Sequence, residues 1–348
     1  MRILIATVQV PFVFGGAEIH AQNLKNAFIE YGHEAEIISI PFKWYPPDRI
    51  PEHILACRLL DIEESCGTPI DLVVGLKFPA YYMKHSNKVL WVLHQHRTAY
   101  DLWDTDYCDL KHFPNGTQIR DVIVNSDNKF LREAKKIFAN SRNVSNRLKR
   151  FNDINAKPLY HPPQDADKFY CSDFENYIFY PSRLTDIKRQ HLAISAMCYV
   201  NSDVKLLIAG MPDNVEYEKR LKRLIKENNL KNKVKLLGGI SQKEKLDLYA
   251  NALGVVFVPV DEDYGYITLE GFLARKPVLT IADSGGPLEF VEDNVTGYVA
   301  EPSPQFLGEA IDNLFANKTK AKQMGQAGYE KLQCLNISWK NVVEVLTT

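Results

Sequence analysis

Short apolar runs rich in β-branched residues recur along the chain, and longer amphipathic stretches separate them. The runs are almost continuously hydrophobic, which favours strands that are covered by helices on both faces. They predict strands in the first half at residues 2–8, 35–40, 71–76, 88–94 and 135–141. In the second half they predict strands at residues 177–182, 204–210, 233–239, 254–260, 277–282 and 296–302.

Helical periodicity fills the stretches between these runs. The clearest predicted helices are Ala17–Tyr31, Glu216–Asn228, Lys243–Ala250 and Pro304–Phe315. Alternation of strand and helix indicates a parallel sheet, because parallel strands need a crossover connection. Two such series predict an α/β protein with two doubly wound, Rossmann-like domains.

The two series meet at Asn155–Asp167, which contains three prolines among polar residues. Proline removes a backbone donor and disfavours helix in the residue before it, so we expect an extended linker here. We therefore place the first domain at residues 1–163 and the second at 164–330. Residues 331–348 contain an amphipathic segment around Trp339. This segment either closes the second domain or, as we expect, packs back towards the first.

The composition excludes several classes of protein. The 348 residues carry 42 Lys and Arg against 43 Asp and Glu, without the basic excess of a nucleic-acid-binding protein. A hydrophobic content of 45% excludes an acidic disordered chain. No apolar run approaches the roughly 18 residues of a membrane-spanning helix, and the first segment resembles a core strand rather than a signal peptide. Since the six cysteines form no C-x-x-C pair, we expect a cytoplasmic protein with reduced thiols.

Two carboxylates follow the predicted strand at 254–260. Glu262 lies in the loop after it, Gly265 permits a tight turn, and Glu270 lies in a helix predicted from about Thr268. Ligands bind at the carboxyl ends of parallel strands, and carboxylates accept hydrogen bonds from the vicinal hydroxyls of a sugar or a ribose. The spacing fits equally well a solvated loop acid and an acid that the helix dipole favours.

Two other strand ends in the second half carry groups that suit a phosphate. Gly285 and Gly286 allow a backbone to approach an anion, and a helix is predicted to begin near Pro287. The same residues fit ordinary helix-start chemistry.

Arg183 and Lys188 follow the predicted strand at 177–182. The guanidinium fork and the ammonium point charge could both reach a diphosphate. Two surface cations five residues apart are also common without any such role.

In the first half, Phe14-Gly15-Gly16-Ala17-Glu18 follows the first strand and begins a helix. It is not a dinucleotide-binding fingerprint, but a Gly-Gly loop allows backbone contact with a phosphate or a sugar. His94 ends the strand at 88–94, where it can form a hydrogen bond with a substrate hydroxyl. His94 and His96 have no carboxylate cluster nearby, so we expect no metal site.

The stretch Arg132–Arg150 carries seven basic residues and one acid, Glu133. A solvated helix face is the simplest interpretation. The functional alternative is contact with an anionic acceptor or with the inner membrane surface.

In this order, the motifs resemble those of the family 4 retaining glycosyltransferases of the GT-B fold (glycosyl transferases group 1). The resemblance covers nearly the whole chain: G-G-A-E, a strand-terminal His, S-R-L-x-x-x-K, E-x7-E and G-G-x-x-E. The family pattern reads roughly G-R-L-x-x-x-K, E-x-F-G-x-x-x-x-E-A, G-x-P-V and G-G-x-x-E. The chain departs from it with Ser182 for Gly, Tyr264 for Phe, Gly271 for Ala and Arg275 for Gly.

The resemblance implies two Rossmann-like domains that face a central cleft. It implies that Arg183 and Lys188 hold the donor diphosphate and stabilise charge on the leaving nucleotide. Glu262 would bind hydroxyls of the donor sugar with His94 beside it, and Glu270 would bind the ribose hydroxyls. Backbone contacts would come from Gly15, Gly16, Gly285 and Gly286, and the base would lie against Gly238–Ser241, which includes Gly239.

The resemblance also implies a reaction. A nucleotide-diphosphate sugar would serve as donor, a saccharide or lipid-linked hydroxyl as acceptor, and no metal or other cofactor would be required. The expected context is cell-surface polysaccharide or glycolipid biosynthesis in the cytoplasm, without nucleic acid and with peripheral contact at the inner membrane surface as a further option. The alternatives are a nucleotide-sugar 2-epimerase of the same architecture and a non-catalytic nucleotide-sugar-binding subunit.

Overall fold

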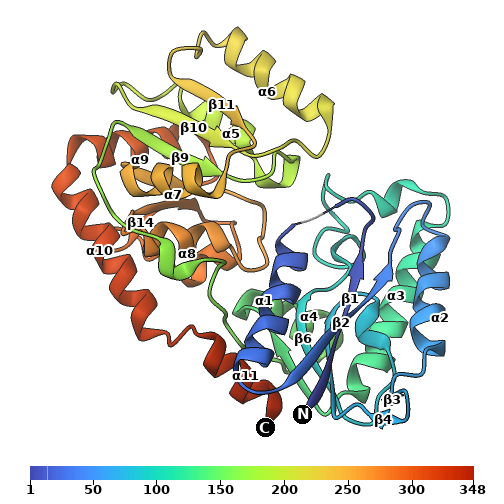
Figure 1. Cartoon of the computed structure of the whole chain (residues 1–348). Coiled ribbons are helices and arrows are strands. Elements are labelled where there is room, and N and C mark those ends of the chain that lie inside the picture. Colours follow the sequence, from blue (N-terminus) through green and yellow to red (C-terminus); the bar gives the residue numbers. More distant parts are fainter. Residues whose placement is uncertain (14) are drawn as a thin grey trace. The chain divides into compact units, whose positions relative to one another are not determined.

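The computed structural model describes residues 1–13 and 15–348, which fall into two compact units. Unit 1 comprises residues 1–164 and 338–348, and unit 2 comprises residues 165–337 (Figure 1). The expected C-terminal range, 331–348, begins inside helix α10 (Lys318–Cys334). That helix continues to Cys334 because its apolar face extends to the buried Leu332.

Unit 1 is built on a parallel sheet with the strand order β2-β1-β5-β6-β7-β8. The strands of this sheet are β1 (Arg2–Gln9), β2 (Glu34–Pro41), β5 (Leu72–Lys77), β6 (Lys88–His94), β7 (Lys136–Ala139) and β8 (Lys157–Pro158). A short antiparallel hairpin is formed by β3 (Glu64–Ser65) and β4 (Thr68–Pro69). The helices are α1 (Gly16–Glu30), α2 (Arg49–Leu59), α3 (Gly116–Phe130), α4 (Arg142–Asn152) and α11 (Trp339–Thr347), with 3₁₀ turns η1 (Ala80–Tyr82), η2 (Arg97–Ala99), η3 (Leu110–His112) and η4 (Leu131–Glu133).

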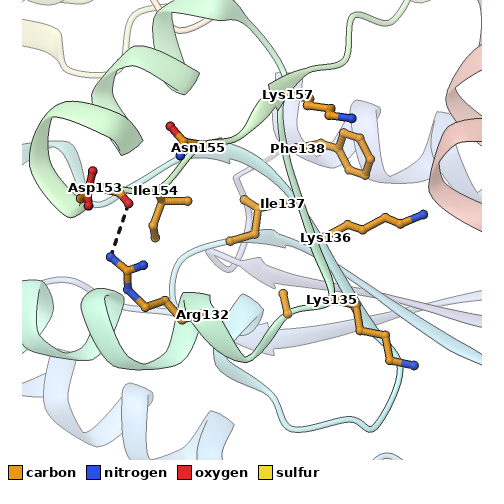
Figure 2. Close-up of a pocket in the computed structure, with 10 residues that line it drawn as sticks. Arg132, Lys135, Lys136, Ile137, Phe138, Asp153, Ile154, Asn155 and Lys157 are labelled. Carbon is orange, nitrogen blue, oxygen red and sulfur yellow. Dashed lines mark hydrogen bonds between the residues drawn. The ribbon is translucent and has the colours of Figure 1, made fainter.

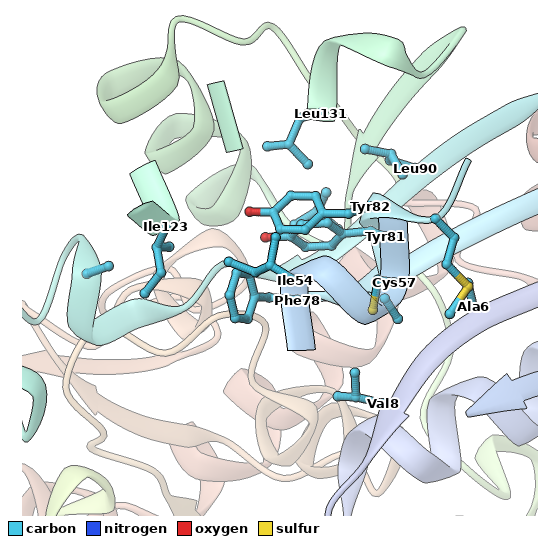
Figure 3. Close-up of a cluster of buried hydrophobic side chains, with 14 of the residues drawn as sticks. Ala6, Val8, Ile54, Cys57, Phe78, Tyr81, Tyr82, Leu90, Ile123 and Leu131 are labelled. Atoms are coloured by element: carbon cyan, nitrogen blue, oxygen red, sulfur yellow. The ribbon is translucent and has the colours of Figure 1, made fainter. Parts of the chain in front are cut away.

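Apolar side chains cover both faces of this sheet because successive strand residues point to opposite sides. Ile3 and Ile5 of β1 belong to a cluster with α1 and α11, whereas Ala6 and Val8 belong to a cluster with α2, α3 and α4. Figure 3 shows the second cluster, in which the rings of Phe78, Tyr81 and Tyr82 lie together. The first cluster includes Val342, Val343 and Leu346 of α11, so this helix is part of the core of unit 1.

Unit 2 is built on a second parallel sheet with the order β11-β10-β9-β12-β13-β14. Its strands are β9 (Tyr177–Pro181), β10 (Lys205–Ala209), β11 (Val234–Gly238), β12 (Gly254–Val256), β13 (Val278–Ile281) and β14 (Gly297–Ala300). Besides α10, its helices are α5 (Gln190–Ala196), α6 (Val215–Glu227), α7 (Gln242–Asn251), α8 (Tyr266–Leu273) and α9 (Pro304–Ala316), with 3₁₀ turns η5 (Ala166–Lys168), η6 (Asp186–Lys188) and η7 (Gly286–Glu289).

The predicted strands and the four clearest predicted helices are confirmed, with ends that shift by a few residues. The largest shift is at the strand predicted for 254–260, because β12 ends at Val256. Residues 257–260 leave the ladder, although Phe257 and Val258 remain buried. Across residues 1–13 and 15–348, no helix combines the length and apolar character needed to span a membrane.

Candidate functional site

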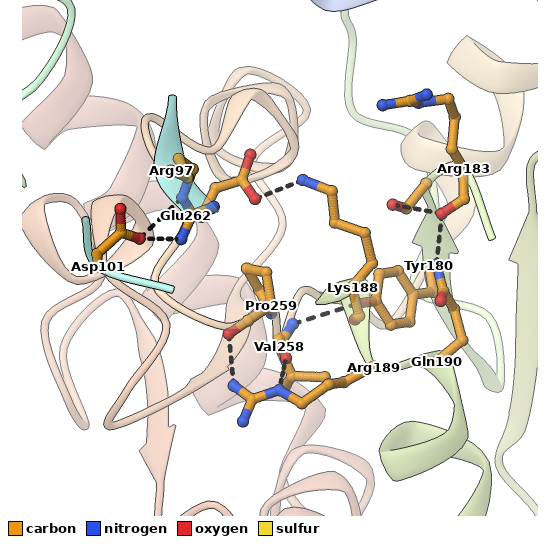
Figure 4. Close-up of polar contacts among 11 residues, drawn as sticks. Arg97, Asp101, Tyr180, Arg183, Lys188, Arg189, Gln190, Val258, Pro259 and Glu262 are labelled. Carbon is orange, nitrogen blue, oxygen red and sulfur yellow. Dashed lines mark hydrogen bonds and ion pairs between the residues drawn. The ribbon is translucent and has the colours of Figure 1, made fainter. Parts of the chain in front are cut away.

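The sheet of unit 2 has a switch point between β9 and β12, where connections lead away in opposite directions. Ligands of open parallel sheets bind outside the strand ends at such a point. The loop after β9 carries Lys188, and the loop after β12 carries Glu262. Lys188 Nζ donates a short hydrogen bond to Glu262 Oε2, and each side chain is 19% exposed (Figure 4). The structure therefore brings two of the sequence-predicted residues into direct contact.

Backbone hydrogen bonds join the Glu262 loop to the glycine loop after β13. Glu262 N donates to Ser284 O at 2.8 Å, and Gly286 N donates to Glu262 O at 2.7 Å. A Cβ on Gly286 would lie 2.6 Å from Tyr264 O, so the close approach of these loops requires glycine. Gly285 has φ +70°, which also favours glycine. The two predicted glycines thus set the position of Glu262.

The helix predicted near Pro287 is wrong in type and length. The chain forms only the four-residue 3₁₀ turn η7, after which Phe290 N and Val291 N both donate to Pro287 O. Because the turn is not continued, no α-helix N-terminus points at a ligand here. Any anion contact at this loop would come from the backbone around Gly285 and Gly286.

Glu270 lies in α8 and pairs with a different cation. Lys245 Nζ of α7 donates to Glu270 Oε1 at 2.5 Å, and Tyr249 Oη donates to Oε2 at 2.6 Å. Burial, with the Glu270 charge beside it, raises the pKa of Tyr249 well above its usual value, so its hydroxyl stays a donor. No local sequence pattern predicts either partner, because both lie 21 or more residues away on a separate helix.

Arg183 lies at the surface, where 55% of its side chain is exposed. Its Nη1 contacts Asp213 Oδ1 at 3.1 Å and Oδ2 at 3.3 Å. An ion pair this exposed contributes little to stability. Gln190 Nε2 donates to Arg183 O at 2.8 Å and fixes the backbone below the guanidinium. The side chain is therefore anchored at its base and accessible at its tip.

Two other positions in unit 2 were singled out from the sequence. A Cβ on Gly239, just after β11, would lie 3.2 Å from Met211 Sδ. Arg275 has φ +51°, the left-handed conformation that explains why the family pattern has glycine there. Its guanidinium lies 4.7 Å from the ring centroid of Tyr329 on α10.

The predicted residues of unit 1 lie at strand ends of their own sheet. Gly15 caps α1, with its N donating to Glu18 Oε2 at 2.8 Å and its O accepting from Ile19 N at 3.0 Å. Gly16 is the first residue of α1, and Phe14 lies outside the described residues. His94 is the last residue of β6, and its Nδ1 lies 2.7 Å from Gln95 O.

The sequence pattern does not predict the buried carboxylate that contacts Gln95, the residue after His94. Asp127 of α3 accepts hydrogen bonds from Gln95 Nε2 at 2.8 Å and from the hydroxyls of Tyr81, Tyr82 and Tyr100 at 3.0, 2.5 and 2.6 Å. Burial raises the pKa of Asp127 above its usual value. The network fixes Gln95, the residue that follows His94.

The basic stretch Arg132–Arg150 is not one helix face. It runs through η4, β7 and α4, and Arg147 is buried with its Nε 3.8 Å from Asp101 Oδ2. The exposed members Arg132, Lys135 and Lys136, together with Lys157, border a hollow of about 540 Å³ (Figure 2). Arg142, Lys149 and Arg150 are exposed on α4, as a solvated helix face predicts, whereas the other exposed members form a basic rim around a depression.

Within residues 1–13 and 15–348, no three His, Cys, Asp or Glu side chains are grouped so that they could hold a metal ion.

Comparisons with known proteins relate the chain to glycosyltransferases. Residues 167–331 match the family model of glycosyl transferases group 1. Over 130 residues the chain is 34% identical to alpha-1,3/1,6-mannosyltransferase ALG2 of Mus musculus, covering 36% of this chain and 31% of that protein. The match thus spans about a third of the relative's length. Over 367 residues it is 23% identical to the uncharacterized glycosyltransferase MJ1607 of Methanocaldococcus jannaschii, covering 91% and 90% of the two chains.

Solved structures show the fold. Anabaena Alr3699/HepE, crystallised in complex with UDP and glucose, superposes with a TM-score of 0.72 at 18% identity. The superposition covers 100% of this chain and 98% of that one. The chain therefore has the GT-B fold, and its residues 167–331 match the family model of glycosyl transferases group 1.

Proposed function

We propose that the protein is a retaining glycosyltransferase that moves a sugar from a nucleotide-diphosphate sugar to a hydroxyl of a saccharide or lipid-linked acceptor. The observation that carries the proposal is the Lys188–Glu262 pair at the switch point of unit 2. The pair would offer a cation to a phosphate beside a carboxylate for sugar hydroxyls, within a domain that matches the model of glycosyl transferases group 1. The pathways we favour are those that build cell-surface polysaccharide or glycolipid.

The chemistry follows from charge. As the bond between the anomeric carbon and the diphosphate oxygen breaks, the leaving nucleotide gains negative charge. Lys188 and the accessible guanidinium of Arg183 would stabilise that charge, and Glu262 would orient the donor sugar through its hydroxyls. The acceptor oxygen bonds to the anomeric carbon on the same face, and its proton passes to the departing phosphate. The two cations supply the electrostatic role, so we propose that no metal is required.

Glu270 is proposed to accept hydrogen bonds from the ribose. The glycines at 285 and 286, and those at 15 and 16 in unit 1, would offer backbone contacts to sugar or phosphate. Gly239 and its loop would lie by the base, and His94 by the donor sugar. Relatives named mannosyltransferase, and a structural neighbour crystallised with UDP and glucose, make mannose and glucose the first sugars to try.

The test is an incubation of the purified protein with UDP-, GDP- and ADP-sugars, with and without saccharide and lipid-linked acceptors, and with and without EDTA. Retained anomeric configuration in an acceptor-dependent product supports the proposal. A changed sugar without acceptor would identify the nucleotide-sugar 2-epimerase instead. Nucleotide-sugar binding with no product would indicate the non-catalytic subunit, and activity that EDTA abolishes would contradict the metal-free mechanism.

We further propose peripheral contact with an anionic membrane surface through the basic hollow of unit 1. The side chains of Lys135, Lys136 and Lys157 extend to the same side in Figure 2, and in the described part of the chain their ammonium groups make no hydrogen bond or ion pair. Apolar Ile137 and Phe138 line the depression between them. Each lysine near an anionic surface contributes about 1 kcal/mol, so three together favour binding roughly 150-fold.

Vesicle flotation tests this contact. Wild-type protein is expected to float with phosphatidylglycerol vesicles and not with phosphatidylcholine vesicles, and the triple variant Lys135→Glu, Lys136→Glu, Lys157→Glu is expected to lose binding. The matched control changes three exposed lysines of α6, Lys219, Lys222 and Lys226, to Glu. Equal losses in both variants, or no flotation of the wild type, would contradict the contact and leave the transferase proposal standing.

A further inference from the structure

Arg189 follows Lys188 directly and is held in an unusual backbone conformation. Its φ is +54°, in the left-handed region that favours glycine, and it is the residue before α5. The residue is only 9% exposed. A buried, charged side chain in this conformation persists only where the surrounding structure holds it firmly.

The guanidinium of Arg189 contacts two other loops, and Figure 4 shows its contacts with Val258 and Pro259 in the first of them. Its Nε donates to Val258 O at 2.8 Å, and its Nη2 donates to Pro259 O, both in the segment between β12 and Glu262. Its two terminal nitrogens also contact Asp283 in the loop after β13, with Nη1–Oδ2 at 2.9 Å and Nη2–Oδ1 at 2.6 Å. The fork of the guanidinium matches the carboxylate, which makes this a directional contact.

The three loops joined by Arg189 are those that carry the candidate site. The first bears Lys188, the second bears Glu262 and the third bears Gly285 and Gly286. Backbone bonds reinforce the arrangement, since Val260 N donates to Ile187 O and Asp261 N donates to Asp283 O, each at 2.9 Å. The hydroxyl of Tyr180 donates to Lys188 O and holds the backbone on its other side.

We infer that Arg189 is a positioning residue for sugar transfer. Its contacts with the three loops fix the separation of the Lys188 ammonium and the Glu262 carboxylate. They also fix the position of the Gly285–Gly286 loop relative to these two groups. The inference rests on the proposed function. Arg189 itself contacts backbone carbonyls and Asp283, and these contacts use four of its five N–H groups, so it acts through its neighbours rather than on the substrate.

Substitutions at residue 189 differ in how many of these contacts they keep. Glycine relieves the backbone conformation and deletes all four contacts. Lysine keeps the charge and one or two contacts but lacks the planar fork. A side chain needed for fold stability alone would lower the melting temperature without separating turnover from binding. A positioning residue lowers turnover and leaves nucleotide affinity nearly unchanged, because misplacement of reacting groups by about 1 Å costs up to roughly 100-fold.

The experiment compares Arg189→Gly, Arg189→Lys and Asp283→Asn with Arg220→Lys, a matched control at an exposed arginine that pairs with Asp186. For each, kcat and KM for the donor, the nucleotide Kd and the melting temperature are measured. We expect kcat to fall about 100-fold in Arg189→Gly and about 10-fold in Arg189→Lys and Asp283→Asn, with nucleotide Kd within about threefold of wild type. The control is expected to match the wild type.

Two results would overturn the inference. One is a kcat within about twofold of wild type in both folded Arg189 variants. The other is a parallel loss of nucleotide affinity and turnover, which would make Arg189 a binding residue. If Arg189→Gly fails to fold, Arg189→Lys and Asp283→Asn decide the matter. A wild-type protein that transfers no sugar overturns the proposed function and the inference together, whereas an active wild type with unaffected variants overturns the inference alone.

Discussion

The two units balance their buried carboxylates in different ways. Asp127 of unit 1 is surrounded by neutral donors, three tyrosine hydroxyls and one amide. In unit 2, Glu262 and Glu270 each pair with a lysine. Neutral donors from the core form a closed network that suits a structural role. A lysine that pairs with a carboxylate can instead exchange partners, because a diphosphate can replace the carboxylate beside the ammonium. The contrast distinguishes the structural carboxylate of unit 1 from the two carboxylates of the candidate site.

The histidines are also distributed unequally between the two units. Eight of the nine belong to unit 1, and His191 belongs to unit 2. Burial lowers the pKa of His20 to about 3, and burial beside His20 lowers the pKa of His161 well below its usual value. The two rings are 4.3 Å apart between centroids, beside Trp91 and Trp339. Acid sensitivity is thus greater in unit 1, while in unit 2 burial lowers the pKa of His191 in α5 to about 4.

The largest expected effect tests the lysine of the site. Lys188→Ala is expected to lower turnover by roughly 10²–10³, because it removes a cation aimed at the developing phosphate charge. Arg183→Ala is expected to cause a loss of the same order. Steady-state kinetics with the active donor measure both, and circular dichroism checks the fold. Lys219→Ala, at an exposed pair on α6, is the control. Near-normal turnover in either purified site variant would contradict its assignment.

The next effect tests the scaffold. Asp127→Ala is expected to lower the free energy of unfolding by about 3 kcal/mol, since it leaves several buried donors without an acceptor. Urea unfolding measures the loss, and calorimetry with nucleotide is expected to show unchanged affinity. Asp121→Ala, at an exposed position on the same helix, serves as control. A large change in nucleotide affinity without loss of stability would make Asp127 part of a site.

Acidification is expected to weaken unit 1 first. His20 has a lowered pKa in the folded state, so the unfolded chain binds its proton between about pH 6.5 and pH 3. Its contribution to the free energy of unfolding is therefore complete above pH 6.5 and is lost as the pH falls. The loss reaches about 2 kcal/mol at pH 5. All four tryptophans lie in unit 1, so tryptophan fluorescence during urea unfolding reports this unit. Hydrogen exchange in β9–β14 reports the other. If the amides of unit 2 lost their protection from hydrogen exchange at a higher pH than unit 1 unfolds, this prediction would be contradicted.

The sequence was sufficient for the elements that bury continuous apolar runs. The strands of both sheets could be located because their hydrophobicity is local, and the edge strand β8 was missed because Lys157 and Pro158 carry no such pattern. Ligands of parallel sheets bind outside the carboxyl ends of the strands. This is why the loops that carry Lys188, Glu262 and Gly285 could be identified before any contact was known.

The partners of those residues could not be identified in the same way. Lys245, Asp213 and Asp283 reach the site from other elements, and nothing in their sequence surroundings distinguishes them from surface charges. Asp127 lies in a polar stretch of α3 that gives no sign of its burial. The four-residue turn at Pro287 also depends on a tertiary fit, since Gly286 packs against the backbone of Tyr264. The local sequence pattern predicts the strands and helices, whereas the ion pairs between them depend on the tertiary structure.

The smallest expected effect tests whether Glu270 is a structural carboxylate, like Asp127, or a carboxylate of the candidate site. Glu270→Gln keeps an acceptor for Tyr249 but removes the charge that holds Lys245, whose side chain is 25% exposed and can turn to water. The free energy of unfolding is therefore expected to change by less than about 1 kcal/mol. Nucleotide affinity is expected to fall about tenfold, equivalent to about 1.4 kcal/mol, because an amide is a weaker acceptor for ribose hydroxyls.

Calorimetry with UDP, GDP and ADP, together with urea unfolding, measures both quantities for Glu270→Gln, and Glu309→Gln on the exposed face of α9 is the control. The pattern expected is the inverse of that for Asp127→Ala, in which stability falls and affinity is kept. If Glu270→Gln instead destabilises the protein as much as Asp127→Ala does and leaves nucleotide binding intact, Glu270 belongs with the structural carboxylates. The candidate site would then contract to the loops around Lys188 and Glu262.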